Sequence, residues 1–385
     1  MSRNDGLVRF CQVGYLFVGA IGIIFPPLMP SIISHFGLSL AAAGLAFPAR
    51  SFGSLLGSMF SGVASDLFGR KPLLVVSALL QAGGLTLAAF AGYWLLFLLG
   101  FVIMGVSQGA VSTIINALTS DLRQDDRARA FNVLHGIYSV GAALSPLLIA
   151  LVLRWGQDWR VIFLGAAAIW FVYGVSALWF DYPEQSGSVA KRQLLSVAFL
   201  KDRLALSLFA VAFIYNGVAW VLLGWVNMYL QEGGGVSPFL ATSMISLFYV
   251  GLTTGRFVCA AVAERIGYGN SIRILSVGAA ISLLLVILGG HPLLIVFGVI
   301  MSGLFLSGLY PTALAFANNL FPALAGTVVA TMSLAMNLGT MLPPWWTGII
   351  AEKTNFKIAV GANYILMLPL LWIAWRLPKI EKGRA

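Results

Sequence analysis

A single arginine lies deep within one of the long apolar stretches of this chain, and its chemistry is that of an anion-binding group. Arg50 is about eleven residues into the stretch 39–63, which places it near the middle of a membrane-crossing helix at 1.5 Å of rise per residue. An arginine at that depth costs about 2.5–3.5 kcal/mol on insertion scales. The guanidinium must therefore meet carbonyls, hydroxyls, water or a bound anion. Two roles stay open: a ligand for an anion, and an arginine held by helix carbonyls.

Amide, hydroxyl and aromatic side chains occur at a similar depth in other apolar stretches. Gln108, Ser112 and Asn116 are spaced four apart, so they share one face of a helix. The remaining members of the set are Tyr138, Tyr215, Asn216, Tyr249, Tyr310 and Asn337. Together they suit a small polar organic solute, such as a sugar or a carboxylate. The alternative is hydrogen bonding between helices, which contributes about 0.6 kcal/mol per bond on average.

The acidic residues all lie outside the apolar stretches or at their ends. Proton-coupled symporters often use a buried carboxylate whose pKa is raised by desolvation. Were the chain a transporter, uniport and exchange would therefore be as open to it as coupling to protons. His135, about one turn into its stretch, could carry a proton, although a packing role is favoured. We find no nucleophile paired with a base, no metal-ligand spacing and no phosphate loop, so we expect neither an enzyme nor a cofactor or metal.

A charged and glycine-rich segment, GVASDLFGRK at residues 62–71, separates two of the apolar stretches. Gly62 and Gly69 permit the tight turn that such a short connection needs. Asp66, Arg70 and Lys71 place opposite charges within reach of one another. The chemistry expected here is a set of ion pairs at the membrane surface.

The elements that must position these residues are long helices. Charged residues make up only 9% of the 385 residues, against about 25% in soluble domains. The apolar stretches are long enough to cross a hydrocarbon core about 30 Å thick as helices. We expect an all-α membrane protein with twelve spans, at roughly 9–35, 39–63, 72–91, 93–119, 130–155, 160–181, 204–230, 237–263, 271–290, 293–318, 324–350 and 358–377.

The net charge of +10 follows the membrane topology. Most of the 23 Lys and Arg residues fall in the loops on one side of these spans, together with both termini. Because such loops stay cytoplasmic, we expect both ends of the chain inside the cell and the protein in the cytoplasmic membrane. No nucleic-acid partner is implied.

The two halves of the chain match each other. A polar segment, 182–203, separates residues 1–181 from 204–385, and we expect it to be a cytoplasmic linker between two six-helix bundles. At an offset of 198 residues Gly69 falls on Gly267, and SVGAALSP at 139–146 falls on NLGTMLPP at 337–344. Repeated halves with a binding site between them are how many secondary transporters are built.

The segment 62–71 resembles the loop 2–3 signature of the major facilitator superfamily, and the resemblance extends over nearly the whole chain. It implies helices 1, 4, 7 and 10 around a central cavity and rocking between outward-open and inward-open states. It also implies a gate on the cytoplasmic side, with Asp66 capping helix 11 and Arg70 paired with Asp121. The further members of that gate are Gly62, Gly69, Lys71, Arg127, Arg129, Arg256 and Glu264. The alternative is that these are solvated loop charges of little energetic effect.

The branch of the family is less clearly marked. Residues 116–146 and 310–322 resemble the fucose/glucose-type sugar symporters, yet Pro26 and Ser112 stand where those place carboxylates. Drug-efflux members carry an arginine where this chain has Gly105. We therefore expect a monomeric transporter of a small polar organic solute, an organic anion or sugar-like molecule. A lipid or drug exporter is the alternative, and a receptor on the same fold stays open.

Overall fold

The computed structural model describes the chain except for residues 1–2, 124–125, 183–201, 235, 322–323 and 385. The side chains of Asp66, Arg127 and Glu264 also lie outside the described part, as does nearly all of the predicted linker 182–203. Within the described residues the regular elements are helices, as expected. They form two compact units, residues 1–38 with 45–190 and residues 39–44 with 191–385.

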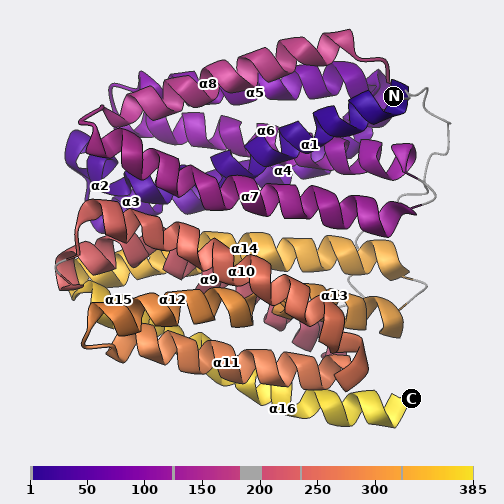
Figure 1. The fold of residues 1–385 in the computed structure, drawn as a ribbon, viewed down its shortest axis with the longest axis vertical. Coiled ribbons are helices and arrows are strands. Elements are labelled where there is room, and N and C mark those ends of the chain that lie inside the picture. Colours follow the sequence, from indigo (N-terminus) through magenta and orange to yellow (C-terminus); the bar gives the residue numbers. More distant parts are fainter. Residues whose placement is uncertain (1–2, 124–125, 183–201, 235, 322–323, 385) are drawn as a thin grey trace. The chain divides into compact units, whose positions relative to one another are not determined.

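The first unit is a bundle in which α5 and α8 lie side by side, and α4 and α5 both pack on α6 (Figure 1). Its elements are α1 (Arg3–Gly22), α2 (Phe25–Phe36), α4 (Ala46–Phe68), α5 (Arg70–Ala89), α6 (Trp94–Leu122), α7 (Arg127–Arg154), α8 (Trp159–Ser176) and the 3-10 helix η2 (Ala177–Trp179).

The second unit repeats this plan, with α10 packed on α12 and α11 beside α16 (Figure 1). Its elements are α3 (Leu40–Gly44), α9 (Arg203–Gly234), α10 (Pro238–Ile266), α11 (Tyr268–Leu288), α12 (Pro292–Leu306), α13 (Leu309–Leu320), α14 (Ala325–Lys353), α15 (Phe356–Ala362), η5 (Asn363–Leu366) and α16 (Met367–Arg384).

The first expected span is a bent, broken helix, and short interruptions occur in three others. The first bends by 43° between α1 and α2, where Gly22 is followed by Pro26 and Pro27. Short turns or a 3-10 segment interrupt the second, tenth and twelfth spans at α3–α4, α12–α13 and α15–η5–α16, and the tenth and twelfth still pass as single segments, Pro292–Leu320 and Phe356–Leu377. A proline lacks the amide hydrogen that would continue the preceding helix, which explains the first break.

Nine helical segments of the described residues are long and apolar enough to cross a membrane, and the bent pair α1–α2 makes a tenth. Ten of the twelve expected spans thus pass on length and composition. The other two correspond to α4 and α14, which are 23 and 29 residues long. Their length suffices, but α4 is rich in serine and glycine, and α14 contains Asn337, Pro343 and Pro344. Polar groups on intramembrane helices characteristically face the bundle interior.

Glycines bring α4 and α6 into backbone contact in the first unit. A Cβ atom at Gly53 would overlap the carbonyl oxygen of Val102, and one at Gly57 would overlap that of Val106. Small residues at such spacing let helices approach closely in a membrane. This seam fixes the position of α4, the helix that carries Arg50.

The second unit contains the same seam between α10 and α12. A Cβ atom at Gly251 would overlap the carbonyl oxygen of Ile300, and one at Gly255 would overlap that of Leu304. All four positions lie 198 residues after their counterparts. The repeat seen in the sequence therefore extends to individual backbone contacts.

The turns at the ends of α4 and α10 also match. Gly69 has φ +87° and ψ 159°, and Gly267 has φ +85° and ψ 146°. A side chain is disfavoured at positive φ, so glycine is required in both turns.

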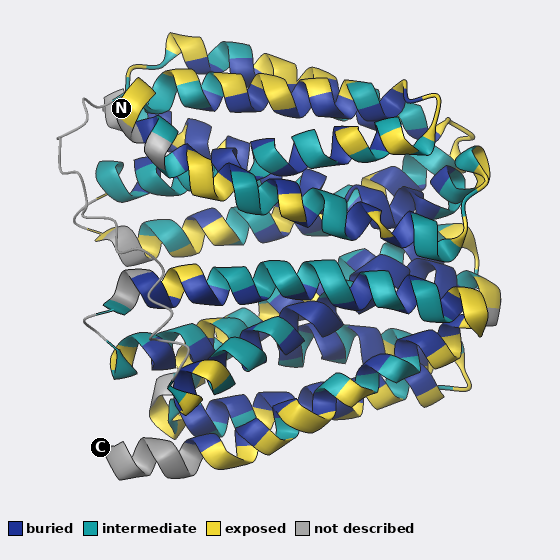
Figure 2. Cartoon of the chain, turned by 180° about the vertical axis from the view of Figure 1, so that it is seen from behind, coloured by how far each residue is buried: buried dark blue, intermediate teal, exposed yellow. Residues whose placement is uncertain are grey.

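Many exposed side chains on the surfaces of the two units are apolar. Exposed positions alternate with buried ones along the helices in Figure 2, and on α5 and α8 they include Val76, Leu80, Phe171 and Val172. Surfaces of this composition are suited to acyl chains.

Candidate functional site

Arg50 holds the broken end of α1. The last carbonyls of a helix lack intrahelical partners, and α1 ends at Gly22, inside the bundle. Nη1 of Arg50 donates to the carbonyl of Gly22 at 2.7 Å, and Nη2 donates to that of Ile21 at 2.9 Å. The cation thus meets the negative end of a helix in the planar two-point geometry that guanidinium favours. Of the two roles expected for Arg50, the carbonyl-held one is present in the structure.

Gln108 of α6 completes this clamp. Its Oε1 accepts from Nη2 of Arg50 at 2.6 Å, and its Nε2 donates to the carbonyl of Val18 in α1 at 3.2 Å. Three helices are thereby joined through one side-chain pair. The clamp borders the hydroxyl of Tyr138, since a Cβ atom added at Gly22 would lie 3.1 Å from that oxygen.

A second polar group lies on the same face of α6. Nδ2 of Asn116 donates to the hydroxyl of Tyr15 at 3.2 Å. The ring of Tyr15 lies 5.3 Å from that of His135 and 5.8 Å from that of Tyr138. Oδ1 of Asn116 is buried and accepts no hydrogen bond from the described residues. Half-buried Ser112 lies between Gln108 and Asn116 on this helix face.

Tyr15 was not among the residues predicted from the sequence. The sequence feature that could have indicated it is a tyrosine within the first apolar stretch, at a depth in the membrane close to that of Asn116. The first unit brings together the predicted residues Arg50, Gln108, Asn116 and Tyr138. They follow one another from the break at the end of α1 toward α7. A buried acceptor with no donor from the described chain is suited to a hydroxyl group or a water molecule.

The predicted amides of the second unit are used within the protein. Nδ2 of Asn216 donates to the carbonyl of Met336 and to Oγ1 of Thr340, both at 2.6 Å. Nδ2 of Asn337 donates to the carbonyl of Ser333 in its own helix at 2.9 Å. These contacts favour the helix-packing interpretation for both amide NH₂ groups.

Aromatic rings supply the rest of the predicted set in this unit. Tyr215 and Tyr310 are stacked, with ring centroids 6.3 Å apart and an interplanar angle of 17°. Tyr249 is buried, and its ring meets that of Phe248 edge-on at 6.0 Å. The three phenols therefore belong to packed aromatic groups.

The predicted pair at the start of α5 is present. Arg70 forms an ion pair with Asp121 at the end of α6, and their side chains are 17% and 39% exposed. Lys71 lies beside it and donates to the carbonyls of Leu178 and Phe180 at 2.7 and 2.9 Å. It therefore ties α5 to the end of η2, a partner that the sequence did not indicate.

The other predicted gate residues are more scattered. Arg129 pairs with Asp126 at 3.8 Å, with both side chains largely exposed, and Arg256 is half-buried in α10. Gly62 has open space around its Cα. Sequence reasoning missed a further pair in the first unit, between Arg123 and Asp5 at 2.7 Å.

We predict that exchanging the charges of Arg70 and Asp121 separates a gating role from a stabilising one. Either single change, Arg70→Asp or Asp121→Arg, leaves like charges adjacent and should reduce solute flux severely. Because Asp121 is partly exposed, the pair should contribute only about 1 kcal/mol to stability. The double exchange should recover a substantial part of the flux. Flux in proteoliposomes and thermal unfolding together provide the measurement, and normal flux in both single variants would remove the gating role.

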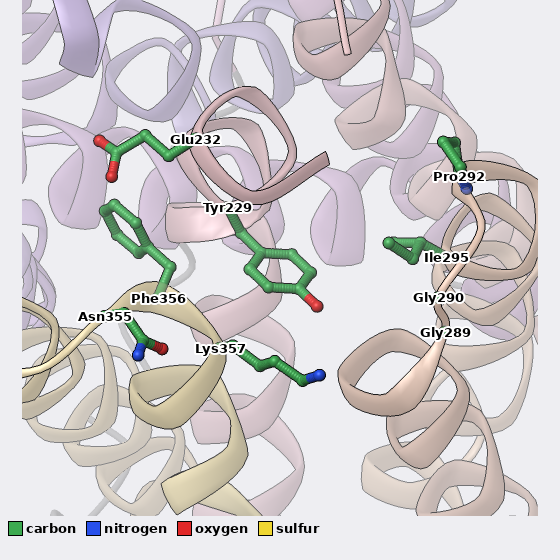
Figure 3. Close-up of a pocket in the computed structure, with 9 residues that line it drawn as sticks. All are labelled: Tyr229, Glu232, Gly289, Gly290, Pro292, Ile295, Asn355, Phe356 and Lys357. Carbon is green, nitrogen blue, oxygen red and sulfur yellow. The ribbon is translucent and has the colours of Figure 1, made fainter. Parts of the chain in front are cut away.

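One described pocket of about 470 Å³ lies in the second unit, away from these residues. Its lining, shown in Figure 3, consists of Tyr229, Glu232, Gly289, Gly290, Pro292, Ile295, Asn355, Phe356 and Lys357. The carboxylate of Glu232 points away from the amino group of Lys357 in this view (Figure 3), and Tyr229 donates to the carbonyl of Val286 at 3.0 Å. The residues predicted to bind solute do not line it.

Long apolar helices in two repeated units, with polar side chains enclosed in the bundles, define a multi-pass membrane transporter. The family model of the major facilitator superfamily matches residues 13–299 and again 235–384. The chain belongs to the major facilitator superfamily of secondary transporters. The expected fold class and family are thereby confirmed.

Individual relatives are distant but extend over most of the chain. An uncharacterized MFS-type transporter, YfkL of Bacillus subtilis, is 25% identical over 88% of this chain and 87% of its own. The gentisate transporter of Corynebacterium glutamicum is 27% identical over 92% of this chain and 83% of its own. Among solved structures, a D-xylose-proton symporter aligns with a TM-score of 0.81 at 17% identity, covering 98% of this chain and 97% of that one. That likeness shows the fold alone.

Proposed function

We propose that this transporter carries a small organic anion. The observation that supports this most strongly is the polar line in the first unit, from the Arg50 clamp through Gln108 to Asn116 and Tyr15. It combines a cation, a nearby phenol and a buried amide oxygen with no donor from the described residues. A carboxylate bearing a hydroxyl or phenol group matches that set, because the anion meets the field of Arg50 and the hydroxyl can donate to Asn116.

Two relatives support the same class of solute. One is the gentisate transporter, and another is named as a probable sulfoacetate transporter, SauU of Cupriavidus necator, 25% identical over 67% of this chain and 65% of its own. Both names specify organic acids. A sugar-like cargo has the weaker support, since the xylose symporter is related to this chain by its fold alone.

The mechanism we propose is alternating access, in which the two repeated units rock about a site between them. We propose that the protein acts as a monomer in the cytoplasmic membrane. The concentration of basic residues in the loops on one side supports placing both termini inside. No carboxylate was expected within the spans, so exchange or uniport is as compatible with the chain as coupling to protons.

A drug exporter is the second candidate. The multidrug resistance protein MdtL of Salmonella agona is 25% identical over 90% of this chain. That candidate predicts a tolerant site that binds bulky apolar solutes. For a drug exporter, Arg50 should be unimportant for solute binding, because its guanidinium would only bind the free carbonyls at the end of α1. A lipid exporter makes the same prediction for apolar solutes.

A thermal-shift comparison on the purified protein distinguishes these candidates. Gentisate and sulfoacetate should raise the unfolding temperature in a saturable manner, whereas xylose and neutral gentisamide should not. A ligand raises the unfolding temperature when it binds the folded protein and does not bind the unfolded chain. A shift with a range of cationic apolar drugs, and none with the two acids, would replace the anion proposal by the drug exporter.

A further inference from the structure

Two arginines of the second unit lie against tryptophan rings on neighbouring helices. The guanidinium carbon of Arg273 in α11 lies 5.1 Å from the ring centroid of Trp375 in α16, and that of Arg376 lies 3.8 Å from the ring centroid of Trp372. The two helices pack side by side (Figure 1), and both tryptophans are more than half exposed. Two cations are therefore held on one pair of adjacent helices.

These ring contacts leave the hydrogen-bonding edge of each guanidinium available. A guanidinium meets an aromatic ring with its flat face, whereas its five N–H groups point outward in its plane. Arg273 uses one of them, since its Nη2 donates to Oδ1 of Asn270 at 2.9 Å. Helix α11 contains no acid, and the acid of α16, Glu381, comes five residues after Arg376. Two planar cations with free donors are suited to the oxygens of a phosphate group.

The position of the two arginines along their helices is that of a lipid phosphate. Arg273 lies little more than one turn into α11. Arg376 immediately precedes Leu377, the last residue of the apolar segment Phe356–Leu377. Tryptophan rings concentrate where the hydrocarbon core meets the headgroup layer. Both guanidiniums are therefore expected in that layer, on the same side of the membrane.

Exposed apolar side chains continue from the arginines along both helices. On α11 they include Ile274, Ile281 and Leu288, which are seven residues apart and therefore share one face. On α16 Leu368 and Trp372 are four residues apart and also share a face. The same surface thus combines cations for a headgroup with an apolar face for acyl chains.

We propose that Arg273 and Arg376, with Trp372 and Trp375, form a binding site for an anionic phospholipid. The phosphodiester accepts hydrogen bonds from the free edges of the two guanidiniums, and the acyl chains lie along α11 and α16. Basic side chains between membrane helices recognise anionic headgroups by this chemistry. A zwitterionic lipid is disfavoured, because no carboxylate among the described side chains of these two helices could meet its ammonium group. This inference goes beyond the proposed solute and does not depend on it.

Competition between two lipids with identical acyl chains tests this site without any solute. The full-length protein, purified in detergent, is incubated with equal amounts of phosphatidylglycerol and phosphatidylcholine, and the lipids retained are counted by native mass spectrometry. We expect retained phosphatidylglycerol to exceed phosphatidylcholine by about fivefold for each arginine. Glycerophosphate carries the charge without acyl chains and should not displace the bound lipid at the same concentration. Equal retention of the two lipids, or displacement by glycerophosphate, would overturn the proposal.

Variants of the two arginines locate the site. Arg376→Gln changes an exposed side chain and should lower the preference for phosphatidylglycerol about fivefold, and Arg273→Gln in addition should remove most of the remainder. Arg376→Lys keeps the charge without the planar fork and should give an intermediate preference.

The matched control removes two other exposed arginines, Arg203 at the start of α9 and Arg265 near the end of α10. The double variant Arg203→Gln/Arg265→Gln changes the net charge equally and should leave the preference unaltered. An equal loss in this control, or an unaltered preference in Arg273→Gln/Arg376→Gln, would assign the effect to general surface charge and reject the site. Neither outcome touches the proposed solute, because none is present in the assay.

Discussion

Replacing Arg50 by glutamine is expected to abolish the response to organic acids and to destabilise the protein substantially. The variant loses hydrogen bonds to the carbonyls of Gly22 and Ile21 and to Oε1 of Gln108. Each orphaned partner inside the bundle costs about 1–3 kcal/mol, so the total loss should be about 3 kcal/mol or more. Thermal unfolding with and without gentisate measures both effects.

Arg50→Lys separates the charge from the geometry of the clamp. Lysine keeps the cation but has no planar fork, so it cannot reach all three acceptors in the same way. We expect a lowered unfolding temperature together with a retained, weaker gentisate shift. Arg129→Gln, in which a largely exposed side chain is changed, is the control that should leave both quantities unaltered. If gentisate stabilised Arg50→Gln as strongly as the parent, Arg50 would be a structural residue alone.

The second large effect is expected at the contact between α1 and α7. A Cβ atom at Gly141 would overlap the carbonyl oxygen of Leu16, and one at Gly19 would overlap the carbonyl oxygen of Tyr138. Gly141→Ala must therefore force two helix backbones apart. We expect a loss of about 1–3 kcal/mol or more, because a carbonyl within a helix cannot move as a side-chain end can. Unfolding temperature and the monodisperse yield after extraction are the measurements.

The same helix provides a matched control. Gly136 of α7 has no neighbour within 4 Å of an added Cβ atom. Gly136→Ala should be neutral or mildly stabilising, by up to about 1 kcal/mol, because alanine is the better helix former. Gly339→Ala tests the repeat, since its Cβ atom would lie 2.5 Å from the carbonyl oxygen of Phe213 in the second unit. Similar unfolding temperatures for Gly141→Ala and Gly136→Ala would contradict the close approach.

The fold followed from the sequence because the length and spacing of apolar stretches determine where membrane helices form. The breaks did not follow, although Pro26, Pro27 and the glycine at 22 gave a signal for the first one. Whether a proline kinks a membrane helix or ends it depends on which neighbouring groups satisfy the freed carbonyls. Here Arg50, which belongs to another helix, donates hydrogen bonds to the freed carbonyls at the end of α1.

The site was foreseen in part for the same reason. Depth and helical spacing were sufficient to select Arg50, Gln108 and Asn116. Their partners are backbone carbonyls and a tyrosine on α1, and these depend on how three helices pack. The ion pair of Arg70 with Asp121 was expected from a family motif, and its role in gating stays a prediction. No sequence pattern predicted that residues 39–44 pack on α14, because alanine and glycine carry no side-chain group that indicates a partner.

The glycine seams have a mechanical consequence for the transport cycle. At Gly53 and Gly57 of α4, and at Gly251 of α10, the neighbouring atoms are backbone atoms of α6 and α12, so no side chain lies there that could change its rotamer as one helix slides along the other. Sliding within these pairs should therefore be resisted, because a displacement along the helix axis brings a carbonyl oxygen against a Cα. Each helix pair should move as a rigid body. The conformational change of the transport cycle must then occur at hinges where helices are interrupted, such as the joint between α1 and α2.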